Sequence, residues 1–246
     1  MGAKPTYISK EDLQKAYQDL GSLNAVGEKF LVDSSTIKSK MIKYGLEFKP
    51  QIRYTCDNDF FSRDDEKSFY WAGFIAADGC VKDRKASHGY GGRIYELQIG
   101  LSKKDKEHLI KFKNDICAEN PIHDFKIKGR VYKNKKYKDS FKSEITIVNK
   151  KICDDLERFN IVPRKSLIYK FPEWIKNHYL VNHFIRGYFD GDGCLFIYDN
   201  QLCFNLLGTE DCLTSIKDIF IKNNLYKSKY KNIRKIKNRK QKKQMN

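Results

Sequence analysis

The 246-residue sequence contains no Cys-x-x-Cys pair and no run of eighteen consecutive apolar residues. Its seven cysteines are an odd number without metal-site spacing, which excludes a zinc ribbon and argues against a disulfide framework. The missing apolar run excludes a membrane-spanning helix, and the N-terminal Met-Gly-Ala-Lys-Pro has no signal-peptide core. We therefore expect a reduced, cytoplasmic protein without membrane attachment.

Acidic residues are also scarce, because 31 Asp and Glu face 48 Lys and Arg, which leaves a net charge of +17. Each Lys or Arg that neutralises a phosphate releases condensed counterions, so the charge favours a polyanionic partner. A hydrophobic share of 40%, with 16 Phe and 15 Tyr, indicates a folded core. These features favour a globular protein that binds nucleic acid.

Residues 9–45 predict three short helices. Ser9 is a typical N-cap before a helix over Glu11–Asp19, and a second helix is predicted over Leu23–Phe30. The third runs from about Ser35 to Tyr44 and stops at Gly45. The pattern resembles helix-turn-helix units, in which the helix after the turn reads bases, although a purely structural three-helix bundle is the alternative. The candidate DNA-contacting residues are Thr36, Lys38, Ser39 and Lys43.

From Asp64 onward the chain contains a tandem repeat. A helix predicted over Glu66–Asp78 ends W-A-G-F-I-A-A-D-G-C, and one over Leu180–Asp192 ends I-R-G-Y-F-D-G-D-G-C. Each copy is expected to continue strand, strand, helix, and the first has a longer hairpin loop over Lys82–Arg93. The first copy adds a basic hairpin at about 123–147 and a third helix over Lys150–Phe159.

Small residues recur four positions apart in both apolar helices, where they share one helical face. The pairs are Gly73 with Ala77 and Gly187 with Gly191. Small residues let two backbones approach closely, so the helices are expected to pack side by side about a pseudo-two-fold axis. Asp78 and Asp192 would then emerge together at one end. A divalent cation would keep two adjacent carboxylates ionised, and hard oxygen ligands that leave room for water and phosphate suit Mg²⁺.

The two peptides W-A-G-F-I-A-A-D-G and I-R-G-Y-F-D-G-D-G resemble the signature helices of a single-chain LAGLIDADG homing endonuclease, over residues 64–224. The resemblance implies an α+β fold of two αββαββα repeats, whose saddle-shaped sheets straddle a long duplex. It also implies sequence-specific, Mg²⁺-dependent hydrolysis of double-stranded DNA by a monomer. By position, the metal is assigned to Asp78 and Asp192 with the backbone carbonyls of Ala77 and Gly191. Trp71 and Ile185-Arg186 depart from the signature at packing positions.

Family members place a lysine beyond the third helix of each half, near the scissile phosphates. Lys165 is the best match, and its neighbour Arg164 is the alternative. At the end of the second strand, where the family holds a polar residue that orders water, the resemblance points to Lys103. For DNA reading, Lys126, Lys128 and Arg130 would share one face of a regular strand. Arg93 and Gln98 of the first hairpin are further candidates.

The expected domains are a helix-turn-helix over 1–50, a linker over 51–63, a first half over 64–165 and a second half over 166–225. A second copy matching the first would reach roughly position 265, so this copy is expected to be truncated. Residues 226–246 hold ten Lys or Arg and no acid, which predicts a disordered basic tail. Two explanations stay open: a relic that cuts poorly, or a tail that replaces the hairpin in binding phosphates.

Two functions from different classes fit the sequence. The first is the homing endonuclease, which would promote intron homing by cutting duplex DNA. The second is a non-cleaving binder on the same fold, either a DNA-binding regulator or an RNA maturase that assists splicing of intron RNA. The presence of both motif aspartates favours the first, because a pure binder gains nothing from two carboxylates that face phosphates.

Overall fold

The computed structural model describes residues 7–48, 54–85, 93–129, 131–132, 135–136 and 138–225, with only the backbone described at 131–132 and 135–136. The chain divides into two compact units, Met1–Arg53 and Tyr54–Asn246. Arg130 and the predicted basic tail at 226–246 lie outside the described residues. Within the described part, no helix is both long enough and apolar enough to cross a membrane.

The first unit is a bundle of three helices, as the sequence predicts. Ser9 caps the first helix by accepting a hydrogen bond from the backbone amide of Asp12, and Gly21 ends it in the left-handed conformation that glycine tolerates. Leu13, Val26 and Ile37 are fully buried in its small core. The helices are α1 (Lys10–Leu20), α2 (Leu23–Phe30) and α3 (Ser34–Lys43).

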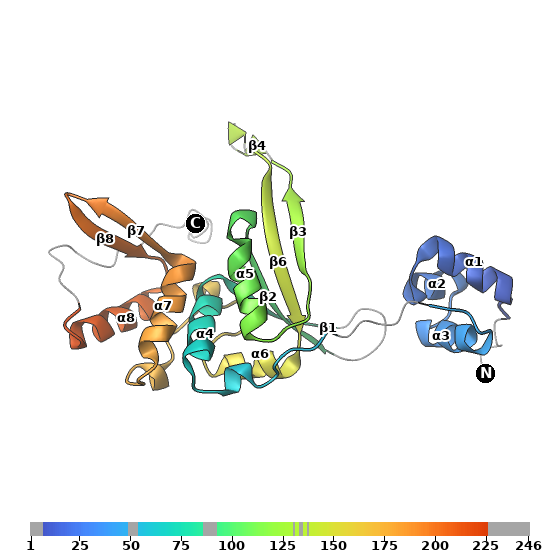
Figure 1. Ribbon diagram of the computed structural model, residues 1–246, viewed down its shortest axis with the longest axis horizontal. Helices are drawn as coiled ribbons and strands as arrows, with labels where there is room; N and C mark the ends of the chain where they lie inside the picture. The colour runs from blue at the N-terminus through green and yellow to red at the C-terminus, as the bar shows by residue number, and fades with distance from the viewer. Residues whose placement is uncertain are drawn as a thin grey trace, which may run out of the picture. The chain divides into compact units, whose positions relative to one another are not determined.

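The first copy of the repeat folds in the expected αββαββα order (Figure 1). Its antiparallel sheet has the strand order β1-β2-β6-β3. Two-residue strands β4 (Val131–Tyr132) and β5 (Lys135–Lys136) pair between β3 and β6. The predicted loop Lys82–Arg93 is too long, because β1 continues to Lys85 and β2 begins at Arg93. The main elements are α4 (Glu66–Asp78), β1 (Gly79–Lys85), β2 (Arg93–Ser102), α5 (Lys106–Asp115), β3 (Ile122–Ile127), β6 (Ser140–Val148) and α6 (Lys150–Glu157).

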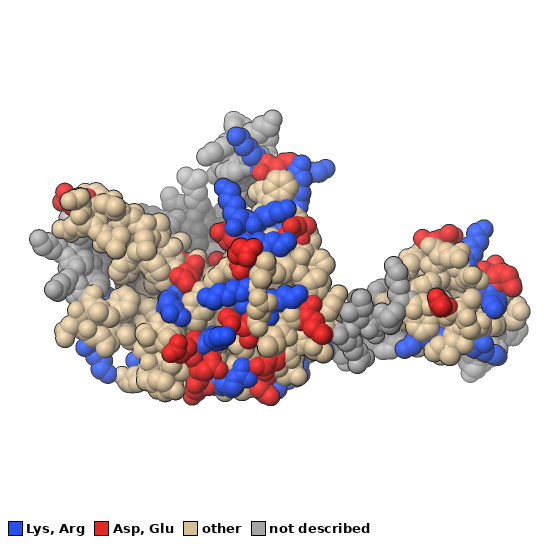
Figure 2. Space-filling view, in the orientation of Figure 1, with Lys and Arg blue, Asp and Glu red and all other residues tan. Residues whose placement is uncertain are grey.

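The second copy repeats the opening of the first. Its described elements are α7 (Val181–Asp192), β7 (Gly193–Tyr198), β8 (Gln201–Leu206) and α8 (Glu210–Lys222). Within the described residues, β8 pairs only with β7, whereas the matching strand β2 also pairs with β6. The hairpin is almost without charge, and Figure 2 shows it as a largely uncharged surface with an acidic side chain at its tip.

Apolar and polar residues alternate along the strands of the first copy, so one face of its sheet covers the hydrophobic core. Val81, Leu97, Ile99, Ile145 and Ile147 point inward and are at most 4% exposed. The residues between them point to the opposite face, as the two-residue period of a strand requires. Helix α4 lies at the centre of this core, since its residues from Ser68 to Ala76 are all buried. The sheet and the helices therefore hold the C-terminal end of α4 in a fixed position.

Candidate active site at the ends of the paired helices

Helices α4 and α7 pack side by side through their glycines, in a reciprocal contact. A methyl group added at Gly73 would collide with the backbone carbonyl of Phe184, and one added at Gly187 would collide with the carbonyl of Tyr70. Tyr70 and Phe184 occupy matching positions of the two copies, so the contact obeys the internal two-fold repeat. The predicted close packing of the two helices is confirmed.

Both helices end at an aspartate. Directly after α4, the amide of Gly79 donates a hydrogen bond to the carbonyl of Ile75. Directly after α7, the amide of Gly193 donates one to the carbonyl of Phe189. Both glycines are extended, so each chain turns from helix into strand directly after Asp78 or Asp192. A helix end leaves its last carbonyls without intrahelical partners, so those of Ala77 and Gly191 are available as oxygen ligands. A methyl group at Gly191 would meet the Ala77 side chain closely, so the helices also touch at this end.

The carboxyls of Asp78 and Asp192 share an electrostatic environment. Partial burial raises the pKa of both above the ordinary 3.8, and the nearby Asp78 carboxylate raises the pKa of Asp192 further. The ammonium of Lys165 acts in the opposite direction on both groups. The two aspartates and Lys165 therefore form one electrostatic cluster.

Lys165 reaches this cluster from the segment that joins the two copies. Its side chain is buried, with the residue 4% exposed, and its Nζ donates a hydrogen bond to the carbonyl of Gly79 at 2.9 Å. Burial lowers the pKa of the ammonium, and Cys80 and both aspartates oppose that effect. Arg164, the alternative by sequence, is exposed and has a left-handed backbone. The structure therefore places Lys165, and not Arg164, beside the carboxylates.

The donors at this cluster fit a hard divalent cation. In the described part of the chain, no three His, Cys, Asp or Glu side chains gather as a metal cage. Two carboxylates and backbone carbonyls instead give a partial set of oxygen ligands, which leaves positions for water or phosphate, as Mg²⁺ prefers. Asp192 is partly buried and Asp78 is more exposed, but desolvation raises the pKa of both, so a cation between the carboxylates would remove an existing electrostatic cost.

We expect Asp78→Asn and Asp192→Asn to raise the stability of the metal-free protein at pH 7. Because both pKa values are raised, the folded state binds more protons than the unfolded chain between pH 3.8 and the raised values. The contribution of these groups to stability therefore falls as pH rises through that window, and the advantage of the Asn variants should vanish below it. Thermal unfolding in a chelator-containing buffer from pH 3.5 to 8 measures the effect.

Asp124→Asn is the matched control with the opposite sign. Hydrogen bonds from Ser143, Lys106 and Lys103 lower the pKa of Asp124 to about 2. This group therefore stabilises the fold above its ordinary pKa, and stability is lost as pH falls toward 2. The Asn variant at position 124 should be less stable than the parent at pH 7. A lower melting temperature for Asp192→Asn than for the parent at pH 7 would contradict the first expectation.

Lys103, which the sequence predicts near the cleavage site, is engaged elsewhere. Its ammonium lies 3.1 Å from a carboxylate oxygen of Asp124 on β3, and Lys106 binds the same carboxylate at 3.1 Å. Lys103 is not among the charged groups that shift the pKa of Asp78 or Asp192. The structure thus brings together Asp78, Asp192 and Lys165, and leaves Lys103 in a separate ion pair.

The predicted DNA-reading residues of the first copy divide between the two faces of its sheet. Gln98 lies on the face opposite the helices, where its side-chain amide bonds Glu144. Arg93 and Lys126 lie on the other face. Arg93 forms an ion pair with Asp83, and Lys126 forms one with Asp139 at 2.8 Å. Lys128 is exposed just beyond the end of β3. Figure 2 shows Lys and Arg side chains gathered over β3, β6 and α5, interleaved with acidic residues.

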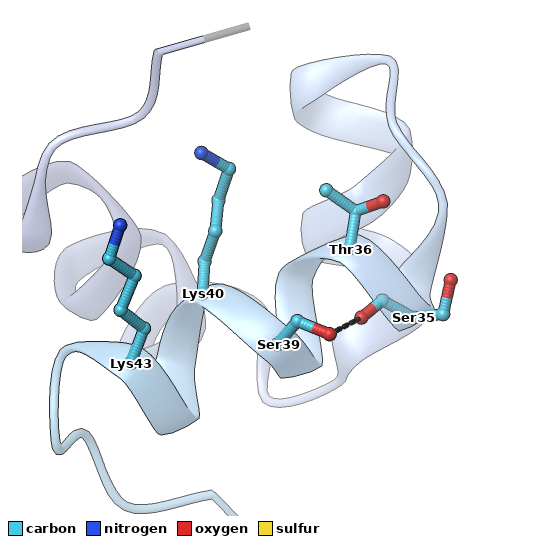
Figure 3. Close-up of a pocket in the computed structure, with 5 residues that line it drawn as sticks. All are labelled: Ser35, Thr36, Ser39, Lys40 and Lys43. Atoms are coloured by element: carbon cyan, nitrogen blue, oxygen red, sulfur yellow. Dashed lines mark hydrogen bonds between the residues drawn. The ribbon is translucent and has the colours of Figure 1, made fainter. Parts of the chain in front are cut away.

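In the first unit, a shallow polar pocket follows the outer side of α3 (Figure 3). It is lined by Ser35, Thr36, Ser39, Lys40 and Lys43. The Ser39 hydroxyl donates a hydrogen bond to the carbonyl of Ser35 at 2.9 Å, and the side chains of Lys40 and Lys43 extend from the helix. Lys38 is exposed but does not line this pocket. Three of the four predicted contact residues therefore share one surface of the helix.

Sequence reasoning missed several polar residues at the helix pair and on the sheet. Tyr70 and Asp190 bond across α4 and α7, and no sequence pattern connects positions 120 residues apart. On the sheet face that carries Gln98, Lys142 bonds Glu144 at 2.7 Å and passes over Gly100. Strand alternation was the available signal for this second group, because it places positions 98, 142 and 144 on one face.

No protein-family model matches the chain, and no relative is found among curated proteins. Solved structures do show similarity. The homing endonuclease I-WcaI bound to its DNA recognition sequence is 16% identical with a TM-score of 0.43, and the match covers 68% of this chain and 73% of that one. The LAGLIDADG meganuclease I-AabMI bound to uncleaved DNA is 15% identical with a TM-score of 0.40, and the match covers 69% and 76% of the two chains.

I-DmoI in complex with DNA and Ca is 17% identical with a TM-score of 0.33, and the match covers 52% of this chain and 58% of that one. Because these identities lie below 20% and the TM-scores below 0.5, the site described above rests on the geometry of the chain itself. Among the solved structures to which this chain is similar are therefore a homing endonuclease, I-WcaI, and a LAGLIDADG meganuclease, I-AabMI.

Proposed function

We propose that the chain is a sequence-specific endonuclease that hydrolyses phosphodiester bonds of double-stranded DNA with a divalent metal, Mg²⁺ in the cell. One observation carries the proposal: Asp78 and Asp192 end two closely packed helices and share a cluster with the buried ammonium of Lys165. The surplus of 17 positive charges supports a duplex as the partner. The resemblance of the two motifs to LAGLIDADG helices agrees with this chemistry.

The residues of the chain have separate tasks at this site. A bound divalent cation would lower the pKa of a coordinated water and stabilise the charge that develops on the phosphate. Asp78 and Asp192 would hold the cation, together with the carbonyls of Ala77 and Gly191. Lys165 offsets part of the repulsion between the aspartates. Its hydrogen bond to Gly79 fixes the ammonium beside the end of α4.

The proposal is tested by incubating the purified chain with a library of genomic DNA fragments, with Mg²⁺ and with a chelator. Discrete cuts that require the metal would support it. Sequence-selective binding without cleavage in Mg²⁺ or Mn²⁺ would show a DNA-binding regulator instead. Preferential binding of structured intron RNA over duplex DNA would point to the maturase alternative.

We further propose that α3 reads bases beyond one end of the site bound by the larger unit. Thr36, Ser39 and Lys43 project from one side of this helix, and hydroxyl and ammonium groups donate well to base edges and phosphates.

Deleting residues 1–50 should shorten the DNA footprint at one end and weaken binding, without moving the cut. The full-length chain with Ser39→Ala and Lys43→Ala is the matched control, because both side chains are exposed and the fold should persist. Losing one phosphate contact should reduce the salt slope of binding by about one. Footprinting and salt titrations measure both effects, and an unchanged footprint after the deletion would exclude this role for α3.

A further inference from the structure

Tyr70 is a buried residue of α4 whose side chain is bound by α7. Its hydroxyl donates a hydrogen bond to the carboxylate of Asp190 at 2.7 Å, and the guanidinium of Arg186 lies 4.9 Å from the centre of its ring. Arg186 and Asp190 are four residues apart, so they lie on one face of α7. Two residues of α7 therefore contact a single tyrosine of α4, one at its ring and the other at its hydroxyl.

The same hydroxyl also connects to α5. The His108 Nε2 lies 3.3 Å from it, and burial lowers the pKa of the imidazole. Because the hydroxyl proton is directed to Asp190, a neutral His108 can donate its Nε2–H to the hydroxyl oxygen. Trp71 and Phe74 enclose the imidazole, with ring centres 4.8 and 4.6 Å away. A chain of two hydrogen bonds thus runs from α5 through α4 to α7.

This arrangement breaks the two-fold repeat of the molecule. The matching positions in the other copy are Phe184 for Tyr70, Ala76 for Asp190 and Ala72 for Arg186. All three of these residues are apolar. The hydrogen bond and the ring contact of Tyr70 therefore have no equivalent at the matching positions of the other copy. Asp190 lies two residues before Asp192, in the last turn of α7.

We propose that Tyr70, Asp190 and His108 form a one-sided clasp that positions the last turn of α7, and with it Asp192, against α4. The glycine contacts allow the two helices to approach, and the Tyr70–Asp190 hydrogen bond adds a directional polar contact between them. A hydrogen bond to a charged acceptor is directional and stronger than a neutral one, so it fixes the register. Tyr70, Asp190 and His108 are positioning residues, because they act through Asp192. The catalytic part of this inference rests on the proposed function.

Four single variants test the clasp. Tyr70→Phe removes the donor, and Asp190→Ala introduces the residue that the other copy carries at the matching position. Asp190→Asn keeps an acceptor oxygen and is the conservative rescue. Tyr44→Phe is the control, because it removes a hydroxyl that bonds the carbonyl of Ile8 at 2.9 Å in the other unit. All four are made in the full chain.

The first readout, amide hydrogen exchange of residues 186–194, needs no catalysis. Tyr70→Phe and Asp190→Ala should accelerate exchange of this turn by roughly tenfold, and the control should match the parent. Asp190→Asn, which keeps a weaker, neutral acceptor, should fall between the two. The second readout is single-turnover cleavage, which should slow by roughly tenfold to a hundredfold in the first two variants with unchanged DNA affinity, because small misplacements of reacting groups are costly.

Unchanged exchange in both Tyr70→Phe and Asp190→Ala would overturn the clasp, whether or not the chain cuts DNA. Faster exchange with an unchanged cleavage rate would show a purely structural bond and would overturn the positioning role. If the parent chain does not cut DNA with any divalent metal, the proposed function fails. In that case the exchange data still decide whether the clasp holds the last turn of α7.

Discussion

Replacing Asp78 or Asp192 with Asn is expected to abolish metal-dependent cleavage while leaving duplex binding nearly intact. In the proposed complex the two carboxylates would face the phosphates and assist only through the cation, so their neutral amides would lose the metal without losing a DNA contact. Losing about 4 kcal/mol of transition-state stabilisation slows a reaction roughly a thousandfold. Single-turnover cleavage of the target with Mg²⁺, and gel-shift binding in a chelator, measure the two effects separately.

Asp83→Asn serves as the control for this experiment. Asp83 is also an aspartate of the first copy, but its carboxylate pairs with Arg93 on the sheet, away from the ends of the helices. Its replacement should change the cleavage rate by less than about threefold, in the range of an ordinary surface substitution. Metal-dependent cleavage at the parental rate by the Asp78→Asn protein would remove Asp78 from the site. Loss of binding in both motif variants would show that the aspartates support the fold and not the metal.

Gly73→Ala and Gly187→Ala should each destabilise the larger unit strongly, although Ala is the better helix former. In an exposed helix, replacing Gly with Ala gains about 1 kcal/mol. Here the added methyl would enter the backbone of the facing helix at Phe184 or Tyr70, and backbone cannot rotate away as a side chain can. We expect a loss of at least about 3 kcal/mol, the upper range for overpacked cores. That loss corresponds to a fall in melting temperature of roughly 6–12 °C.

Gly100→Ala provides the comparison, because its methyl would meet only the ends of two flexible side chains, those of Lys142 and Glu144. Lys142 can move aside, so the melting temperature should change by only a degree or two, which is about 0.5 kcal/mol. Thermal unfolding followed by circular dichroism compares the three variants. A melting temperature for Gly73→Ala equal to that of the parent would mean that α4 and α7 are further apart than described here.

Local sequence signals predicted the helices well. Glu66–Asp78 has an Asp65 N-cap and an apolar interior, and the helix has those bounds in the structure. The helices of the first unit agree to within one or two residues, because their caps are formed by nearby side chains such as Ser9. The limits of the first hairpin loop were predicted less well. The predicted loop covers Lys82–Arg93, whereas β1 continues to Lys85 and β2 already begins at Arg93. Strand pairing, which is not local, determines where such a loop begins.

The candidate site was predicted in part. Internal repetition was enough to pair Asp78 with Asp192. When two matching helices pack side by side about a two-fold axis, the residues that end them lie at the same end of the pair. The resemblance favoured Lys165 and left its neighbour Arg164 as the alternative. The left-handed backbone at Arg164 turns the chain so that the next side chain, Lys165, enters the core and reaches Gly79. Lys103 was associated with this region by resemblance, and the structure places it in an ion pair with Asp124 instead.

The sequence by itself determined the repeat, the apolar helices with their small residues, the two aspartates and the excess of positive charge. These are properties of local composition and spacing, and each can be seen along the chain. Only the tertiary structure decided which polar groups meet. The Tyr70–Asp190 bond joins residues 120 positions apart, and Lys165 bonds a carbonyl 86 positions away. Such contacts depend on the packing of whole helices, which brings distant residues within hydrogen-bond range and leaves no mark in the local pattern.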